Sequence, residues 1–284
     1  MLPLDLYEGI ESAWCPGCGN FPMLKAFKQA LAELMIRPEE ILLVSGIGQS
    51  GKFPHYLKCH TFNGLHGRTL PVATGARLAN PQLKVVAVAG DGECYGEGGN
   101  HLLTTLHRNP DLTLVVNNNQ VYGLTKGQAS PTSDPGFKTV LQPTGVPYPP
   151  LHALALAVAQ DGSWVARGFA GDLEHLRGLY KQALTHQGFS LLEVLQPCVS
   201  FNKVNTYEWY RQRVYRLEEE PGYDPENELW AYQKAKEWGD KIPIGVIYRQ
   251  ARPILEAAHP ALAAGPLARQ LTTRPINQLL ADFF

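Results

Sequence analysis

The stretch Val85–Thr125, VVAVAGDGECYGEGGNHLLTTLHRNPDLTLVVNNNQVYGLT, contains two apolar runs that each stop abruptly at a polar turn. The runs Val85–Ala89 and Leu112–Val116 are short, continuous and rich in β-branched residues. Such runs are typical of strands buried on both faces of a parallel sheet. The segment between them has helical spacing and stops before Pro110. We therefore predict a strand–helix–strand unit whose polar turns lie side by side at the carboxyl ends of the strands, where open α/β sheets bind ligands.

The two turns combine glycines with acidic and amide side chains. Gly90 and Gly92 flank Asp91 and would let a phosphate approach the backbone closely. The carboxylates of Asp91 and Glu93 would repel a bare diphosphate, but Mg²⁺ bound by Asp91, by an asparagine of the second turn and by phosphate oxygens would remove this conflict. An ordinary tight turn and a dinucleotide fingerprint are the alternatives, and the glycine spacing does not fit the fingerprint. The sequence favours a metal–diphosphate site.

A second motif, Cys15-Pro16-Gly17-Cys18, precedes a segment whose apolar residues have helical spacing. A Cys-x-x-Cys turn before a helix occurs in thioredoxin-type dithiols, although no strand is apparent before this one. A zinc ribbon needs a second close cysteine pair, which the chain lacks. An iron–sulfur cluster can combine such a pair with a distant cysteine, and Cys198 is available. From the spacing alone, a cluster, zinc, a dithiol and plain structural cysteines all remain open.

These motifs together resemble a known family. Gly90-Asp91-Gly92 followed by Asn118-Asn119 resembles the metal and diphosphate motif of thiamine diphosphate enzymes. The segments Tyr122–Gln128 and Trp14–Gly19 resemble specifically the β subunit of 2-oxoacid:ferredoxin oxidoreductases, and the resemblance covers roughly residues 10 to 205. It implies an α/β fold with a doubly wound, mostly parallel sheet of the thiamine diphosphate-binding type.

The resemblance also implies an activity and partners. In this family a thiamine carbanion attacks the keto carbon of a 2-oxoacid and CO₂ leaves. Single electrons then pass through an iron–sulfur cluster to ferredoxin, and coenzyme A takes the acyl group; the reverse carboxylation is also known. The cofactor supplies this chemistry, while the protein positions it. The pyrimidine-binding domain with the activating glutamate lies on a separate α subunit, so we expect an α2β2 heterotetramer and no activity from this chain alone.

The resemblance assigns roles to residues of four turns. It implies that Mg²⁺ is bound by Asp91, Asn119 and the backbone carbonyl of Val121. The residues that it implies along the cofactor are Ile47, Gly48, His66, Gly67, Gly90, Asp91, Gly92, Glu93, Asn119, Val121, Gly123, Leu124 and Thr125. His66 lies near two glycines in a polar loop, which favours a cofactor contact, and it is our candidate catalytic histidine.

Lys52 and Lys126 follow glycine-containing turns that the expected fold brings to the cofactor. A compact ammonium group there could pair with the distal carboxylate of a 2-oxoacid that has two carboxylates. Both lysines are therefore candidate residues for catalysis and substrate recognition, and 2-oxoglutarate is the favoured substrate. The alternative is that both lysines are solvated at the rim.

Related β subunits commonly hold one [4Fe–4S] cluster with four cysteines. Three of these positions are matched by Cys15, Cys18 and Cys198. The position in the glycine turn carries Gln49 here, and a neutral amide is a poor iron ligand compared with a thiolate. Either another cysteine replaces it, or the fourth iron has a non-cysteine ligand, or the cluster is labile. Cys94, in the cofactor loop, is the expected fourth ligand, and Cys59 is the second choice.

The composition is that of an ordinary globular protein, with 284 residues of which 44 % are hydrophobic and 18 % charged. A formal net charge of −1 gives no electrostatic reason to expect nucleic acid or an anionic membrane as a partner. No apolar run approaches the roughly 18 residues of a membrane helix, and residues 1–8 lack the basic start and apolar core of a signal peptide. Five cysteines, an odd number, do not suggest a disulfide framework, which favours a cytoplasmic location.

We expect residues 1–198 to form one α/β domain that contains the thiamine diphosphate, Mg²⁺ and iron–sulfur sites. Residues 199–284 are expected to form a C-terminal arm that contacts another subunit. Tyrosines and tryptophans are dispersed there among charges and prolines, as in segments that wrap another surface. Packing of these aromatic residues on their own domain is the alternative.

Two other functions are compatible with the motifs. A non-oxidative, two-subunit thiamine diphosphate decarboxylase would share both polar turns but would need no iron–sulfur cluster. An inactive, metal-stabilised interaction subunit would bind no thiamine diphosphate. The iron content and the thiamine diphosphate content of the purified protein distinguish these functions from the oxidoreductase.

Overall fold

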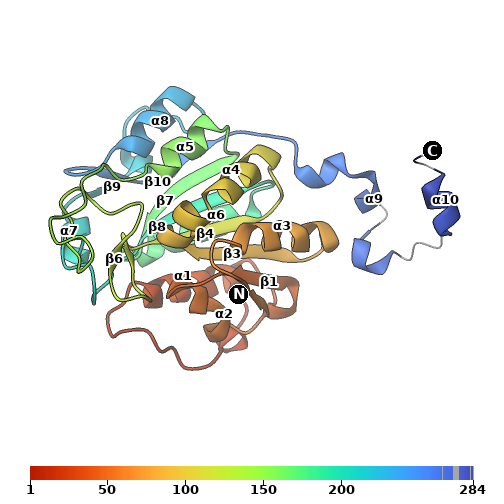
Figure 1. Cartoon of the computed structure of the whole chain (residues 1–284), viewed down its shortest axis with the longest axis horizontal. Coiled ribbons are helices and arrows are strands. Elements are labelled where there is room, and N and C mark those ends of the chain that lie inside the picture. Colours follow the sequence, from red (N-terminus) through yellow and green to blue (C-terminus); the bar gives the residue numbers. More distant parts are fainter. Residues whose placement is uncertain (264, 271–274, 282, 284) are drawn as a thin grey trace.

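An eight-stranded sheet forms the centre of the molecule, and helices cover both of its faces (Figure 1). The computed structural model describes residues 1–263, 265–270, 275–281 and 283. The strand order is β2-β1-β3-β4-β8-β7-β10-β9, and β5 and β6 form a separate two-stranded ribbon. The strands are β1 (Ile41–Ser45), β2 (His60–Asn63), β3 (Lys84–Gly90), β4 (Thr113–Asn118), β5 (Val121–Tyr122), β6 (Gln128–Ala129), β7 (Trp164–Phe169), β8 (Ser190–Leu195), β9 (Val214–Arg216) and β10 (Ile242–Arg249).

The helices differ widely in length. They are α1 (Asn20–Glu33), α2 (Phe53–Tyr56), α3 (Thr69–Ala79), α4 (Gly99–Arg108), α5 (Ala153–Ala159), α6 (Leu173–Thr185), α7 (Tyr207–Arg211), α8 (Glu228–Lys236), α9 (Pro260–Ala263) and α10 (Ile276–Leu280). Short 3₁₀ segments are η1 (Leu4–Tyr7), η2 (Pro38–Glu40), η3 (Ser50–Lys52), η5 (Leu217–Glu219), η6 (Leu255–Ala258) and η7 (Leu267–Arg269), and η4 (Gly92–Glu97) is a π-helical turn. Among the described residues, no helix is both long enough and apolar enough to cross a membrane.

The sheet is doubly wound and mostly parallel, as the sequence predicts. From β1 the chain moves outward to β2, and it then crosses to β3, β4 and β8 on the other side, all in parallel register. β7 pairs parallel with β8, while β10 pairs antiparallel with β7 and parallel with β9. The carboxyl ends of β1, β3 and β4 therefore meet at one edge, and the three turns that follow them lie together there.

Alternate residues of the buried strands face opposite helical layers. In β3, Val86 and Val88 belong to the apolar cluster that includes α1 and α6. Val85, Ala87 and Ala89 belong to the cluster that includes α3, α4, α5 and α8. Because both faces are covered, the run is apolar throughout and does not alternate with polar residues. The strand ends at Gly90, and the turn that follows, from Asp91 to Tyr95, is still buried.

Two further apolar runs of the sequence form strands of the sheet. Residues 41–45 form β1, and residues 190–195 form β8. The carboxylate of Asp172 caps α6, because it accepts a hydrogen bond from the backbone N–H of His175 at 3.2 Å. Such a cap satisfies a donor at the helix start that has no partner within the helix.

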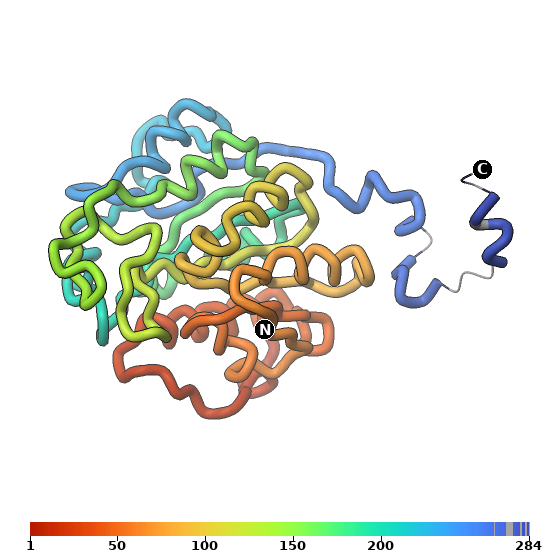
Figure 2. Tube along the Cα trace, in the orientation of Figure 1, coloured from red at the N-terminus to blue at the C-terminus, as the bar shows by residue number. Residues whose placement is uncertain are grey.

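The extended C-terminal segment begins later than the predicted boundary at residue 199. β9 and β10 return to the sheet, and the chain leaves the body of the domain only after β10 (Figure 2). Ile242, Ile244 and Ile247 of β10 are buried in the domain. Charged segments on both sides of these apolar residues hide the strand in the sequence. The arm therefore corresponds to the residues after Arg249.

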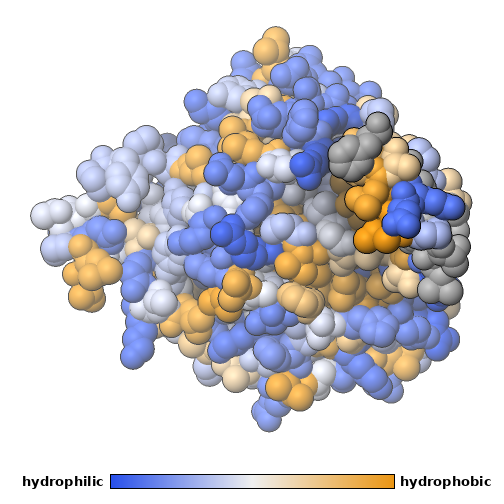
Figure 3. Space-filling model, turned by 45° about the vertical axis from the view of Figure 1, so that its right-hand side comes forward, coloured by the Kyte–Doolittle hydropathy of each residue, from blue (hydrophilic) through white to orange (hydrophobic). Residues whose placement is uncertain are grey.

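Some aromatic residues beyond residue 200 pack on their own domain, whereas others are exposed and free to contact another subunit. Tyr207, Trp209 and Tyr210 pack in a cluster beside the sheet, whereas Trp230 and Tyr232 are exposed. In the arm itself, exposed fractions reach 70 % for Ile276 and 82 % for Phe283. On the face seen in Figure 3, apolar residues gather in the centre and beside the grey atoms.

A buried ion-pair network holds the start of the arm. The Arg77 guanidinium on α3 donates to Asp111 Oδ2 at 2.7 Å and to Glu256 Oε1 at 2.6 Å. The backbone N–H of Asp111 also donates to Glu256, at 3.1 Å. All three side chains are largely buried, so each charge depends on its partners in place of water.

We expect Arg77→Ala to lower the free energy of unfolding by about 3 kcal/mol, because it leaves two buried carboxylates without their cation. Chemical denaturation followed by circular dichroism measures this change. Arg37→Ala is the matched control, because the Arg37–Glu39 pair is mostly exposed and its loss should change stability little. Equal stability of the wild type and Arg77→Ala would contradict the prediction.

Candidate cofactor site

The turns after β3 and β4 meet around Asp91. Asp91 Oδ2 accepts hydrogen bonds from Ser130 Oγ at 2.5 Å and from Thr132 Oγ1 at 2.6 Å. The backbone N–H groups of Gly92 and Asn119 also hydrogen-bond this carboxyl. The Asn119 side chain stays in the turn, because its Oδ1 accepts from the Val121 N–H at 3.0 Å. The two predicted Mg²⁺ side chains are therefore neighbours.

A cavity of about 180 Å³ opens at these turns. All of the residues predicted to line the cofactor lie along it except Gly67. Asp91, Asn119 and Val121 are among them, so the chain offers a carboxylate, an amide oxygen and a backbone carbonyl at one place. This donor set is of the kind that Mg²⁺ prefers.

Glycine is required where the turns approach one another. A Cβ on Gly46 would lie 1.7 Å from Glu93 Oε1, and one on Gly92 would lie 2.3 Å from the Tyr122 ring. Gly48 has a φ of +122°, which L side chains rarely adopt. The backbone is therefore bare along the cavity, which suits the close approach of a diphosphate.

Two buried carboxyls beside the cavity have raised pKa values. Burial raises the pKa of Asp91 to about 6, although the hydrogen bonds from Ser130 and Thr132 oppose this shift. Burial also raises the pKa of Glu93 to about 7, opposed by the Thr69 hydroxyl. Glu93 Oε2 is buried without a hydrogen-bond partner. A cation in the cavity would stabilise both carboxylates, which supports the fit of Mg²⁺ to this site.

Metal-free protein should lose stability as the pH rises from about 4 to about 7. The folded chain holds the protons of Asp91 and Glu93 more tightly than the unfolded chain, so these groups favour folding at low pH, by on the order of 3 kcal/mol each. Burial lowers the pKa values of His152 and His186, which act in the opposite direction.

The test therefore compares melting temperatures from pH 5 to pH 8, in chelator, for the wild type and for the double variant Asp91→Asn with Glu93→Gln. We expect the double variant to gain stability relative to the wild type as the pH rises. A constant difference would contradict the assignment.

His66 lies at the mouth of the cavity, where other side chains hold its ring. His66 Nε2 lies 3.1 Å from Glu97 Oε2, and the ring meets the Tyr122 ring edge-on at 6.3 Å. The Tyr122 hydroxyl lies within 3.3 Å of both Glu97 carboxylate oxygens. Glu97 therefore orients both rings. Gly67 has no room for a side chain, because its Cβ would lie 2.7 Å from that of Glu97.

The two candidate lysines have different surroundings. Lys126 and Lys138 line a second cavity of about 690 Å³, which shares Thr125 with the cofactor cavity. Lys52 follows Ser50, which lines the cofactor cavity, but Lys52 itself lines neither cavity. The structure thus brings Lys126, but not Lys52, to the cavity that adjoins the cofactor cavity.

Cys15, Cys18 and Cys198 come together, although they are far apart in the sequence. The Cys18 N–H donates to the Cys15 carbonyl at 3.0 Å, and the Gly19 N–H donates to the Pro197 carbonyl at 3.2 Å. Burial, with a smaller contribution from the neighbouring Cys198 and Cys15, raises the pKa of the Cys18 thiol to about 11. The cysteine turn thus packs on the segment that follows β8.

The described residues contain no three His, Cys, Asp or Glu side chains close enough to hold a single metal ion. This finding does not conflict with a cluster site, because each cysteine of a [4Fe–4S] cluster binds a different iron and lies farther from the others. The convergence of three thiols therefore fits such a cluster. Gln49 contacts the residue that precedes this cysteine turn, since its carbonyl accepts from the Trp14 indole N–H at 2.9 Å.

Cys94, the expected fourth ligand, is not brought to the other three cysteines. It is 4 % exposed and belongs to the apolar cluster on the face of α3 and α4, whereas Cys18 packs against the cluster on the face of α1 and α6. The sheet lies between the two clusters. The sequence places Cys94 in the cofactor loop, but it does not tell on which face of the sheet the side chain lies.

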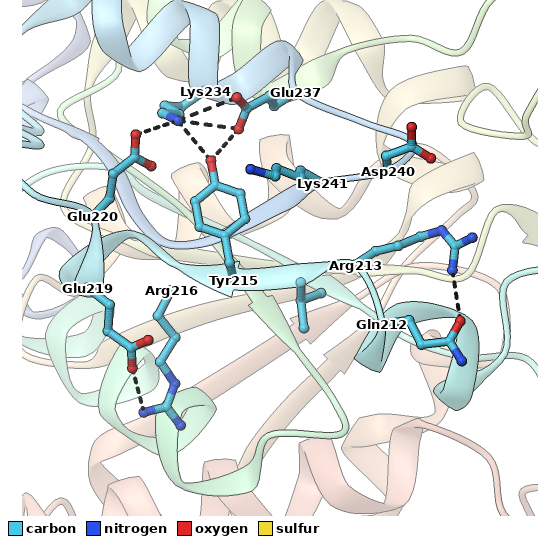
Figure 4. A pocket seen from close by; sticks show the side chains of 11 residues that line it. Gln212, Arg213, Tyr215, Arg216, Glu219, Glu220, Lys234, Glu237, Asp240 and Lys241 are labelled. Carbon is cyan, nitrogen blue, oxygen red and sulfur yellow. Dashed lines mark hydrogen bonds and ion pairs between the residues drawn. The ribbon is translucent and has the colours of Figure 1, made fainter.

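A third cavity, of about 640 Å³, is lined by charged residues of β9, α8 and the segments beside them (Figure 4). Lys234 is paired there with Glu220 at 2.8 Å and with Glu237 at 3.4 Å. The Tyr215 hydroxyl also hydrogen-bonds Glu237. Lys234, Glu220, Glu237 and Tyr215 thus bind one another across the cavity, and we assign this cavity no ligand.

Two known protein families match consecutive parts of this chain. The family described as "Thiamine pyrophosphate enzyme, C-terminal TPP binding domain" matches residues 46–194. A second family, the C-terminal part of the pyruvate ferredoxin oxidoreductase β subunit, matches residues 198–264. The 2-oxoacid:ferredoxin oxidoreductase subunit beta of Saccharolobus solfataricus is 45 % identical over 83 % of this chain and 81 % of its own length.

The chain belongs to the 2-oxoacid:ferredoxin oxidoreductase β-subunit family.

Other members of the family show the same similarity. The 2-oxoglutarate synthase subunit KorB of Archaeoglobus fulgidus is 40 % identical over 69 % of this β subunit and 73 % of its own length. A solved structure of the 2-oxoglutarate:ferredoxin oxidoreductase from Magnetococcus marinus, with 2-oxoglutarate, coenzyme A and succinyl-CoA bound, has a TM-score of 0.90 and 33 % identity. It covers 99 % of this chain, and the match covers 95 % of that chain. The predicted family and fold are confirmed.

Some residues that build the site were missed by sequence reasoning. Ser130 and Thr132 hold Asp91 from the Gly-, Pro- and Ser-rich loop that follows Thr125. Tyr95 of η4 donates to Glu193 Oε2 of β8 at 2.9 Å and so fixes the turn after Asp91. For Ser130 and Thr132, the composition of the loop was the available signal in the sequence. No local signal marks the contact between Tyr95 and Glu193.

Proposed function

We propose that this β subunit binds thiamine diphosphate and Mg²⁺ in an enzyme that oxidises a 2-oxoacid to an acyl-CoA and CO₂, or catalyses the reverse carboxylation, with 2-oxoglutarate as the favoured substrate. Asp91, Asn119 and the carbonyl of Val121 would hold Mg²⁺. The convergence of these three on one cavity beside a three-cysteine site carries the proposal. Thiamine diphosphate, when bound, supplies the nucleophilic carbon that this decarboxylation needs.

The chain's own residues would then bind and orient the reactants. The bare glycine backbone would accommodate the diphosphate, and His66, oriented by Glu97, would exchange a proton at the mouth of the cavity. Cys15, Cys18 and Cys198 would hold an iron–sulfur cluster that passes electrons to ferredoxin. Gln49 lines the cofactor cavity and binds Trp14, so the two sites are neighbours.

The partner would be an α subunit that carries the pyrimidine-binding domain, in an α2β2 assembly. Ile47 and Leu124 line the cavity and are 38 % and 42 % exposed, and Leu65, next to His66, is 76 % exposed. Apolar groups at the mouth of a cofactor cavity suit coverage by another subunit. The exposed apolar residues of the arm suit a second contact, so a chain truncated after Ala258 should co-purify less with the α subunit.

The purified complex with the α subunit tests this function. We expect iron, thiamine diphosphate and a visible absorption band, together with 2-oxoacid- and coenzyme A-dependent reduction of ferredoxin. A colourless, iron-free complex that releases CO₂ without reducing ferredoxin would support a non-oxidative decarboxylase. A complex that binds no thiamine diphosphate would support an interaction subunit without activity.

Substrate preference should depend on Lys126 and Lys52. We expect kcat/KM for 2-oxoglutarate relative to pyruvate to fall about tenfold in Lys126→Ala, because a charge-assisted contact with the distal carboxylate is lost. A smaller fall is expected in Lys52→Ala, because Lys52 lines neither cavity. Lys84→Ala, at the opposite end of β3 from Gly90, is the matched control. An unchanged ratio in both variants would refute a role for these lysines.

A further inference from the structure

Three cysteines meet at one place, and the other two cysteines of the chain lie elsewhere. All five are within the described residues. Cys94 is buried on the opposite face of the sheet from Cys18. A sheet with helices packed on both faces does not let a buried side chain change faces without unfolding its strand–helix unit.

Cys59 is excluded as a fourth cluster ligand because it lies beside the wrong end of β1. His60 pairs with Leu42, so Cys59 lies beside Ile41 at the amino end of that strand. The cysteine turn lies at the other end, because Gln49, which follows β1, accepts a hydrogen bond from Trp14. The length of β1 separates the two, about 13 Å at 3.3 Å per residue. The Cys59 thiol also hydrogen-bonds the backbone at Leu43, which fixes it there.

Gln49 occupies the space between the cysteine turn and the cofactor cavity. Its carbonyl binds Trp14, the neighbour of Cys15, while its side chain lines the cavity and lies close to Gly123. Trp14 is itself fixed by edge-to-face contacts with Phe21 and Tyr56. The residue that contacts both the cysteine turn and the cavity here is therefore a neutral amide, which cannot replace a thiolate as an iron ligand.

We propose, on the basis of the function proposed above, that this chain holds its iron–sulfur cluster through Cys15, Cys18 and Cys198 only, and that the iron without a protein thiolate exchanges readily. A four-iron cluster normally has four cysteine ligands. With three, one iron is held by the cluster sulfides and by a weak or exogenous ligand. The iron that exchanges is the one that a cysteine at the position of Gln49 would bind.

A one-electron oxidant should release this iron. The balanced step is [4Fe–4S]²⁺ plus ferricyanide giving [3Fe–4S]⁺, Fe²⁺ and ferrocyanide, in which the cluster loses one electron and one iron. The three remaining irons keep their thiolates, so the protein need not unfold. Added Fe²⁺ and a reductant should reverse the step.

The test uses the complex with the α subunit, purified without oxygen and treated with one equivalent of ferricyanide per cluster. We expect the wild type to release about one iron per cluster and to show the electron paramagnetic resonance signal of a three-iron cluster. Gln49→Cys should keep its irons and show no such signal. Gln233→Cys, which adds a thiol at an exposed position of α8, is the matched control and should behave as the wild type.

Iron content of further variants tests the ligand set. Cys15→Ala, Cys18→Ala and Cys198→Ala should lose most of the iron, whereas Cys94→Ala and Cys59→Ala should keep the wild-type amount. Loss of iron in Cys94→Ala, or equal resistance of the wild type and Gln49→Cys to ferricyanide, would overturn the inference. If the resistant enzyme still oxidises a 2-oxoacid, the proposed function stands and only the inference fails. Iron-free or zinc-containing protein would overturn both.

Discussion

Asp91→Ala is expected to abolish Mg²⁺-dependent binding of thiamine diphosphate. The side chain that is removed is a buried carboxylate lining the cofactor cavity, where it neighbours Asn119. Without its negative charge, the amide and carbonyl oxygens alone bind a hard divalent cation weakly. We expect the affinity to fall by at least roughly a hundredfold, more than the usual effect of residues that only support a metal ligand.

The fold of Asp91→Ala should be intact, because in metal-free protein the buried carboxylate opposes folding at neutral pH. Titration calorimetry of the complex with Mg²⁺ and thiamine diphosphate measures the loss, and circular dichroism verifies the fold. Ser130→Ala is the matched control: it removes a hydroxyl that hydrogen-bonds Asp91 and leaves the carboxylate, so a smaller loss, about tenfold, is expected. Wild-type affinity in Asp91→Ala would show that the cavity is not the metal site.

The isolated chain is expected to have no turnover with any 2-oxoacid. Its cavity of about 180 Å³ is smaller than the roughly 300–1,000 Å³ usual for pockets that enclose a cofactor-sized ligand. The apolar side chains of Ile47 and Leu124 line it and are exposed, which indicates that another surface completes it. The resemblance assigns the glutamate that activates thiamine diphosphate to the partner subunit.

Activity assays of each subunit alone and of the mixture test this expectation. We expect activity only in the mixture, with ferredoxin reduction that depends on both the 2-oxoacid and coenzyme A. The α subunit alone is the matched control, because it would lack Asp91 and the cysteine site. Turnover by the purified chain alone would contradict the prediction and would require an activating group within this sequence.

The sequence by itself determined the sheet and the turns that carry the cofactor chemistry. The apolar runs at Val85–Ala89 and Leu112–Val116 have no polar residues because both faces of their strands are covered, and this pattern is readable locally. Where the runs end, glycine and acidic or amide residues follow at once. Parallel topology then places the turns at the same edge, so Asp91 and Asn119 could be paired from the chain's local patterns alone.

Only the tertiary structure decided what surrounds these turns. Ser130 and Thr132 reach Asp91 from 39 and 41 residues away, through a loop whose path has no periodic signal. β10 lies in the sheet because its apolar residues find a place beside β7, although charged segments conceal them in the sequence. Such contacts depend on how distant segments pack, which local patterns do not encode.

At the cysteine site, the sequence determined one feature and the tertiary structure decided another. The spacing of Cys15 and Cys18 and the family resemblance were sufficient to pair them with Cys198. Whether another cysteine could join these three depended on the face of the sheet that each candidate occupies. Cys94 points into the apolar layer of α3 and α4, whereas Gln49 is bound to Trp14 beside the cysteine turn. The direction of a side chain after a strand is set by packing on the whole sheet, so only the folded chain decides it.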